Sequence, residues 1–177
     1  LTIGAYGGEM VKEDYGVNDG WGGPRSTSTL VQTISTSDDR YAFFGEGANI
    51  ENTDFSNFQD GYAVTKFTNL LSTDWENTGK RAYPYPDTDF PIFRLADTYL
   101  MYAECAYRGY ADQNLGFAYM NYIRERAHVT PYSSIADIDL NEIRDERMRE
   151  LYWEGHRRTD LIRFGEFTSG TYLWPWK

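Results

Sequence analysis

Two aromatic residues near the start of the chain stand among glycines and polar residues, where their rings could contact a ligand. Tyr6 is followed by two glycines, and Trp21 is flanked by glycine on both sides. Glycine lets the backbone bend and leaves neighbouring rings uncovered. A sugar offers apolar faces to such rings and polar edges to groups like Asn18, Asp19 and Arg25. The alternative is that both rings pack down as loop anchors, and the pattern alone favours this.

A pair of carboxylates, Asp87 and Asp89, comes shortly before a predicted helix. One interpretation is that they cap the helix and interact with its dipole. The other is a Ca²⁺ site, because hard cations take carboxylate and carbonyl oxygens as ligands. The Asp-x-Asp pattern by itself does not decide between the two.

Four glutamates recur at every fourth position between residues 142 and 154, and arginines are interleaved with them. A glycosidase would need two carboxylates that face each other across a sugar, one with a raised pKa. A row along one helix, matched by arginines, instead predicts salt bridges. Arg157, Arg158 and Asp160 are predicted to form a buried or half-buried ionic network that ties the helices together.

Other catalytic or metal-binding patterns are missing from the sequence. His128 and His156 have no cysteine or second histidine at zinc-ligand spacing. No GxSxG, P-loop or GxGxxG motif occurs. The single cysteine, Cys105, allows no internal disulfide and is predicted to be a small buried helix residue between Ala103 and Ala106. These features predict that the chain is not an enzyme.

Charge and hydropathy exclude further classes of function. The 177 residues carry a formal net charge of −10. Nucleic-acid binding depends largely on phosphate neutralisation by Lys and Arg, so the acidic balance argues against it, as it does against docking on anionic lipid. No apolar run reaches the roughly 18 residues that a membrane-spanning helix needs. Aromatic residues make up 17% of the chain, which suits a large core or a ligand-stacking surface.

The elements that must position these residues fall into two regions. Residues 1–90 are rich in Gly, Ser, Thr, Asn and Asp, which predicts a loop-rich ligand-binding region with a short helix from Leu30 and a strand over 61–67. Residues 91–177 show helical periodicity, so the fold is predicted to be mostly α.

Four helices are predicted in the second region. The first starts at Pro91, has a stripe from Phe93 to Tyr107 and stops at Gly109; the second covers 114–127. The third covers 139–153, with Asp139 as N-cap and Gly155 in the left-handed conformation after it. The fourth covers 159–164. The first two form a hairpin of tetratricopeptide size, and such units need stacked neighbours, so further chain is expected at both ends.

Three stretches resemble the SusD/RagB family of glycan-capture lipoproteins in order and spacing. They are YPDTDFPIFRLADTYLMYAE at 85–104, MNYIRERA at 120–127 and ERMRELYWEGHRRTDLIRFG at 146–165. The segments YGG at 6–8, NDGW at 18–21 and TYLWPWK at 171–177 resemble the ligand loop and a later segment of the family's founding, starch-binding member. The resemblance covers about half of the chain strongly.

The resemblance implies a tetratricopeptide-like helical scaffold with a loop-rich ligand face. It implies non-catalytic binding of starch or a malto-oligosaccharide, with Tyr6 and Trp21 in an aromatic arc and Asn18 and Arg25 at its polar edge. It implies a SusC-like TonB-dependent transporter as partner and a lipid-anchored position at the outer membrane, facing the exterior. It also implies Ca²⁺ at Asp87 and Asp89. Another glycan or a peptide as cargo, a glycoside hydrolase and a purely structural partner of the transporter are the alternatives.

Overall fold

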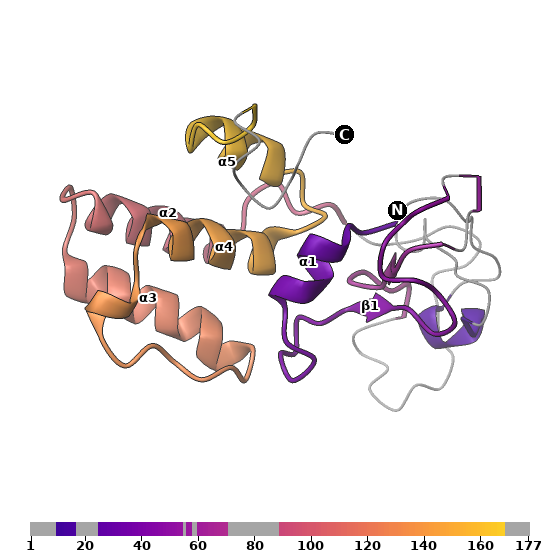
Figure 1. The fold of residues 1–177 in the computed structure, drawn as a ribbon. Coiled ribbons are helices and arrows are strands. Elements are labelled where there is room, and N and C mark those ends of the chain that lie inside the picture. The colour runs from indigo at the N-terminus through magenta and orange to yellow at the C-terminus, as the bar shows by residue number, and fades with distance from the viewer. Residues whose placement is uncertain (1–9, 17–24, 55, 58–59, 71–88, 169–177) are drawn as a thin grey trace. The chain divides into compact units, whose positions relative to one another are not determined.

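The computed structural model describes residues 10–16, 25–54, 56–57, 60–70 and 89–168. Their secondary structure is mostly helical, which confirms the predicted fold class. The chain divides into two compact units, residues 1–32 with 42–89 and residues 33–41 with 90–177 (Figure 1). Among the helices described here, none is both long and apolar enough to cross a membrane.

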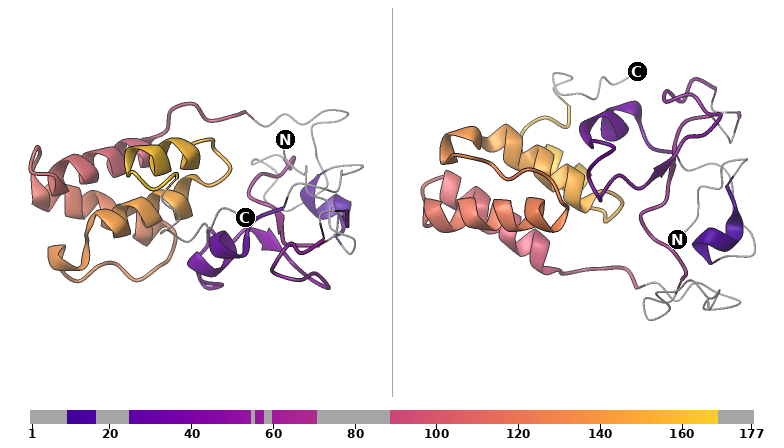
Figure 2. Two further views of the ribbon diagram at one scale, coloured as in Figure 1. Left: turned by 45° about the horizontal axis from the view of Figure 1, so that its top comes forward. Right: turned by 90° about the horizontal axis from the view of Figure 1, so that it is seen from below.

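The second unit is built on a helical hairpin. Helix α2 (Leu95–Tyr107) and helix α3 (Gln113–Arg126) lie side by side, and α4 (Leu140–Leu151) packs along α2 in every view (Figures 1 and 2). A short 3-10 turn, η2 (Ile135–Asp137), contacts α3, and α5 (Arg157–Arg163) contacts α4. The hairpin predicted from the sequence is therefore present.

The ends of these helices follow from local chemistry. Asp112 and Asp139 are extended N-cap residues whose side chains accept backbone hydrogen bonds, the latter from the Glu142 N–H at 2.7 Å. Gly109 and Gly155 have φ values of +86° and +81°, which only glycine adopts without a steric cost. The predicted N-cap at Asp139, the stop at Gly109 and the left-handed conformation of Gly155 are confirmed. Helix α4 nevertheless ends earlier than predicted, at Leu151, and the first positive φ after it belongs to Trp153, at +63°.

The core of the second unit lies between α2, α3 and α4. Leu100, Met120 and Ile143 are each 0% exposed. Burying one such side chain is worth about 1.5–3 kcal/mol. Gly116 permits the close approach of α2 and α3, since a Cβ there would lie 2.7 Å from the Ala106 Cβ. Apolar contacts thus hold the hairpin together, and Gly116 leaves room for the two helices to approach closely.

Three predictions for α2 were wrong. Phe93 is 91% exposed, because Arg94 is extended at φ −146° and the helix begins only at Leu95. Tyr107 is 43% exposed at the last helical residue. Cys105 is also exposed, because a step of two residues from buried Ala103 turns its side chain to the opposite side of the helix.

The first unit is mostly loop. It contains η1 (Lys12–Tyr15), α1 (Ser28–Thr33), whose last residue belongs to the second unit, and two short antiparallel strands, β1 (Phe43–Phe44) and β2 (Ala63–Val64). The predicted helix near Leu30 and the predicted strand are present, although the strand is only two residues long. Gly16, at φ +70°, approaches the Asn69 backbone so closely that a Cβ would overlap it.

Candidate functional site

The structure describes two of the six residues predicted to bind ligand or metal. Arg25 and Asp89 lie within the described ranges. The other predicted positions lie outside the described residues; they are Tyr6, Asn18, Trp21 and Asp87.

Arg25 is half-buried in the first unit. The next residue, Ser26, donates both its backbone N–H and its hydroxyl to the Tyr62 carbonyl, at 2.9 and 3.1 Å. Burial lowers the pKa of the Arg25 guanidinium. The guanidinium nevertheless stays charged at neutral pH, because arginine is too basic to lose its proton in a protein. Arg25 is therefore a positioned, partly desolvated hydrogen-bond donor.

The loop from Asn49 to Asp60 is organised by one carboxylate, that of Asp60. Asp60 accepts hydrogen bonds from the backbone N–H groups of Thr53 and Asp54, at 2.7 and 2.9 Å, and from the Thr53 hydroxyl and the Asn49 amide. The backbone donors of Asp54 and Thr53 are the main reason why the pKa of Asp60 falls to about 2. The Asp60 carboxylate therefore fixes the turn from Asn49 to Asp60.

Gly61, directly after this turn, brings two polar side chains together. It has a φ of +84°, and a Cβ built on it would lie 3.2 Å from the Cβ atoms of both Arg25 and Asn52. The side chains of Arg25 and Asn52 therefore start from neighbouring points across a glycine. The sequence analysis missed Asn52, because no local pattern distinguishes it from the other polar residues of this loop.

The predicted calcium ligands remain untested by these contacts. Asp89 is exposed. Within the part of the chain that the structure describes, no three His, Cys, Asp or Glu side chains gather in a way that could hold a metal ion. A calcium site here would need Asp87 and further oxygen ligands from outside the described residues.

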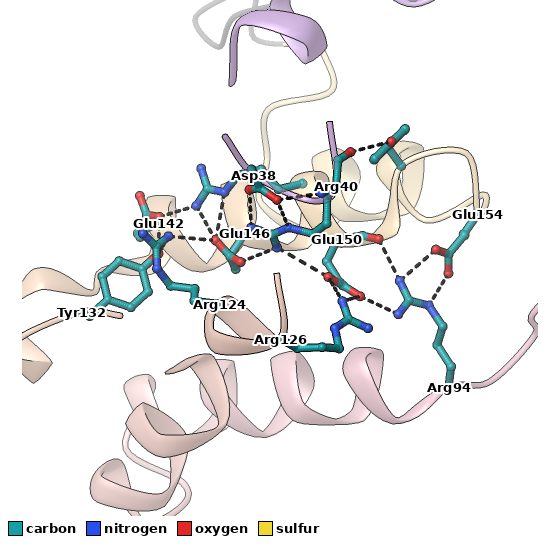
Figure 3. A network of polar contacts seen from close by, with 12 residues as sticks. Asp38, Arg40, Arg94, Arg124, Arg126, Tyr132, Glu142, Glu146, Glu150 and Glu154 are labelled. Carbon is teal, nitrogen blue, oxygen red and sulfur yellow. Dashed lines mark hydrogen bonds and ion pairs between the residues drawn. The ribbon is translucent and has the colours of Figure 1, made fainter. Parts of the chain in front are cut away.

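Three glutamates of the row, Glu142, Glu146 and Glu150, lie on α4 and Glu154 follows its end; the row forms the ion-pair network predicted for it (Figure 3). Glu146 is 0% exposed and contacts Arg40 at 2.6 Å and Arg149 at 2.7 Å. Glu150 contacts Arg94 and Arg126, each at 2.6 Å. Arginines from three separate segments thus converge on one helix.

The charge state of this row argues against catalysis. Burial opposes ionisation of Glu146, but the guanidinium groups of Arg149 and Arg40 outweigh it and lower the pKa of Glu146. Burial and the guanidinium groups of Arg94 and Arg126 have the same opposing effects on Glu150, whose pKa is also lowered. A glycosidase acid needs a raised pKa and a carboxylate partner across a substrate. The row therefore has a structural role, in which its ion pairs hold α4 to the segments that carry the arginines.

A second ionic chain links α2, α4 and α5. Arg147 donates to Asp97 at 2.9 Å and to Asp160 at 2.8 Å. Arg163 bridges Asp160 and Glu104. The prediction of a buried network around Asp160 is confirmed, but its cationic partners are Arg147 and Arg163.

The two arginines predicted to belong to this network make other contacts. Arg157 donates to the Arg144 carbonyl at 3.4 Å, and Arg158 lies over the Phe167 ring. Both residues sit at the start of α5, where Arg157 is half-buried and Arg158 is exposed.

Comparison with known proteins places these features in a family. The model of the SusD family matches residues 2–174. The starch-binding protein SusD of Bacteroides thetaiotaomicron is 40% identical over 144 residues, covering 79% of this chain and 25% of that protein. The SusD-like protein P25 of Formosa agariphila is 46% identical over 79 residues, covering 42% of this chain and 15% of that protein. The chain spans a quarter or less of these relatives.

Solved structures share the fold. The surface glycan-binding protein A of Bacteroides fluxus aligns with a TM-score of 0.63 at 24% identity, over 90% of this chain and 34% of that one. Its counterpart from Bacteroides uniformis aligns with a TM-score of 0.60 at 21% identity, over 86% and 32%. At these identities the likeness concerns the fold alone.

Proposed function

From the premise that the chain belongs to the SusD family, we propose that it binds starch or malto-oligosaccharides at the outer membrane without cleaving them. The bound glycan would pass to a SusC-like TonB-dependent transporter. In this proposal the protein is lipid-anchored and faces the cell exterior, as is typical of the family.

The observation that carries the choice of ligand is the 40% identity over 144 residues to a protein named for starch binding. The family match from residue 2 to 174 includes both predicted stacking residues, Tyr6 and Trp21. An exposed Trp or Tyr ring supplies the flat apolar surface that a glucose face needs, and Arg25 supplies a charged donor for its edge.

Binding without hydrolysis agrees with the engaged state of the carboxylates in the glutamate row and of Asp60. Those of the α4 row are held by arginines, and Asp60 is occupied by backbone donors. Two or three stacked rings with a few hydrogen bonds give a modest affinity, about −4 to −6 kcal/mol, or roughly tens of micromolar to millimolar. A ligand already curved to fit an aromatic arc loses less entropy on binding, so α-cyclodextrin should bind better than maltose.

Isothermal titration with α-cyclodextrin tests the proposal. We expect the full-length protein to bind and its Trp21→Ala variant to lose binding. Tyr110→Ala is the matched control, because Tyr110 is an 85% exposed aromatic residue far along the chain from the predicted loop. Equal binding of maltose would contradict a shaped arc. If no α-glucan gives binding heat with the full-length protein, starch is excluded as the ligand, and other glycans should then be screened.

The delivery step needs a separate test. We expect the full-length protein to co-purify with a SusC-like transporter from outer membranes, and disruption of the transporter to abolish glycan uptake while leaving glycan binding intact. Uptake that continues without any such transporter would refute the delivery step but not the binding proposal.

A further inference from the structure

The first unit contains a buried hydrogen-bond acceptor that is unsatisfied. The Asn52 Oδ1 atom is buried and has no hydrogen-bond partner among the described residues. A buried acceptor without a partner costs stability, and in native proteins such an atom calls for an explanation. A ligand that supplies the missing donor is one explanation.

Hydrogen bonds hold the backbone that follows Asn52 in one position. The next two residues, Thr53 and Asp54, donate their N–H groups to Asp60 at 2.7 and 2.9 Å. The terminal torsion of an asparagine side chain is nevertheless soft, so the carboxamide can turn without moving the backbone. Asn52 therefore combines an anchored Cα with an adjustable acceptor.

The neighbour of Asn52 provides the complementary group. A Cβ built on Gly61 would lie 3.2 Å from the Cβ atoms of both Arg25 and Asn52, so the two side chains start close together. A guanidinium only donates hydrogen bonds, whereas an amide oxygen only accepts them. Each hydroxyl of a sugar both donates and accepts. One donor beside one acceptor therefore fits two adjacent hydroxyls on the edge of a pyranose ring.

We propose that Asn52 is a glycan-binding residue, whose Oδ1 accepts a hydrogen bond from one sugar hydroxyl while the Arg25 guanidinium donates to the adjacent one. This inference rests on the proposed function, in which Trp21, four residues before Arg25 in the sequence, stacks on the glycan. It adds a hydrogen-bonding residue that the sequence analysis did not predict.

The test compares three variants of the full-length protein by titration with α-cyclodextrin. We expect Asn52→Ala to bind about five- to tenfold more weakly, the loss of one or two ordinary hydrogen bonds. Asn52→Asp keeps the acceptor atoms but adds a negative charge that would pair with the Arg25 guanidinium and withdraw it from the sugar, so this variant should bind at least as weakly as Asn52→Ala. Asn57→Ala is the matched control, because Asn57 is an exposed asparagine of the same loop.

Thermal stability separates a ligand-binding role from a structural one. Because the Asn52 acceptor is unsatisfied without ligand, Asn52→Ala should leave the melting temperature of the free protein unchanged or raise it. A fall in melting temperature together with weaker binding would mean that Asn52 supports the loop, and would overturn the inference.

The remaining outcomes distinguish the inference from the proposed function. Undiminished binding by Asn52→Ala, or equal weakening by Asn57→Ala, overturns the inference alone. Binding by Asn52→Asp as strong as that of the unaltered protein would mean that Arg25 does not act beside Asn52, and overturns the paired contact. Failure of the unaltered protein to bind any α-glucan overturns the proposed function and the inference together.

Discussion

Replacing Glu146 by glutamine tests whether the α4 network stabilises the fold. Glu146 is fully buried, and its two carboxylate oxygens meet Arg40 at 2.6 Å and Arg149 at 2.7 Å, with Arg124 at 3.4 Å. Glutamine has nearly the same volume, so no cavity forms. It removes the negative charge and turns an NH₂ group toward a guanidinium.

The expected loss in the free energy of unfolding depends on the arginine charges that stay buried once the Glu146 carboxylate is gone. Removing one partner of a buried ion pair typically costs about 3–5 kcal/mol, because the remaining charge stays buried without compensation. With a urea m value of about 2 kcal/mol/M, this corresponds to a midpoint lower by about 1.5–2.5 M. We expect Glu146→Gln to lie in this range.

Urea unfolding followed by tryptophan fluorescence is the suitable assay, since urea is uncharged whereas guanidinium chloride would screen the ion pairs. Glu125→Gln is the matched control, because Glu125 is an exposed glutamate at the end of α3. Its free energy of unfolding should change by less than about 0.5 kcal/mol, a midpoint shift below about 0.25 M. A midpoint shift for Glu146→Gln below about 0.5 M would show that the network contributes little and would refute this reasoning.

Three further predictions concern pH, packing and metal. Because the folded-state pKa values of Glu146 and Glu150 are lowered, their contribution is present above the ordinary glutamate pKa of about 4.3 and is lost as the pH falls through the folded values. The urea midpoint should therefore be flat from pH 8 to 5 and fall below about pH 4. Leu100→Ala should cost about 2–5 kcal/mol in the same assay, because Leu100 is 0% exposed between the core helices. We also propose that calcium binds at Asp87 and Asp89, so titration of the chelator-treated protein with Ca²⁺ should give heat that Asp87→Asn with Asp89→Asn abolishes.

Much of the helical unit was predictable because its signals are local. Asp139 caps α4 through a hydrogen bond three residues ahead, and Gly109 ends α2 by adopting a positive φ two residues after the last helical residue. Charge spacing also sufficed for the glutamate row, since four-residue steps place side chains on one face. The start of α2 was not predictable, because Arg94 takes an extended conformation, in which its guanidinium pairs with Glu150 and Glu154.

The polar site in the first unit depends on contacts that local patterns do not reveal. Asn52 and Arg25 are far apart in the sequence and meet only across Gly61. The turn that carries Asn52 is held by Asp60, whose hydrogen bonds reach back as far as Asn49. Such long-range juxtaposition follows from the fold, so Arg25 was predicted from residue type and proximity, whereas Asn52 was not predicted at all.

The α4 network also anchors both ends of the segment between residues 41 and 93. Arg40 holds the start of this segment against Glu146 and Glu150, and Arg94 holds its end against Glu150 and Glu154 (Figure 3). The entropy of closing a loop between fixed ends grows slowly, by about 0.6 kcal/mol for each doubling of its length. The helices of the second unit should therefore tolerate changes in the length of this segment. An engineer who keeps Arg40 and Arg94 can alter it to suit another cargo while the helices remain folded, provided that its contacts within the first unit, such as that of Ser26 with Tyr62, are rebuilt.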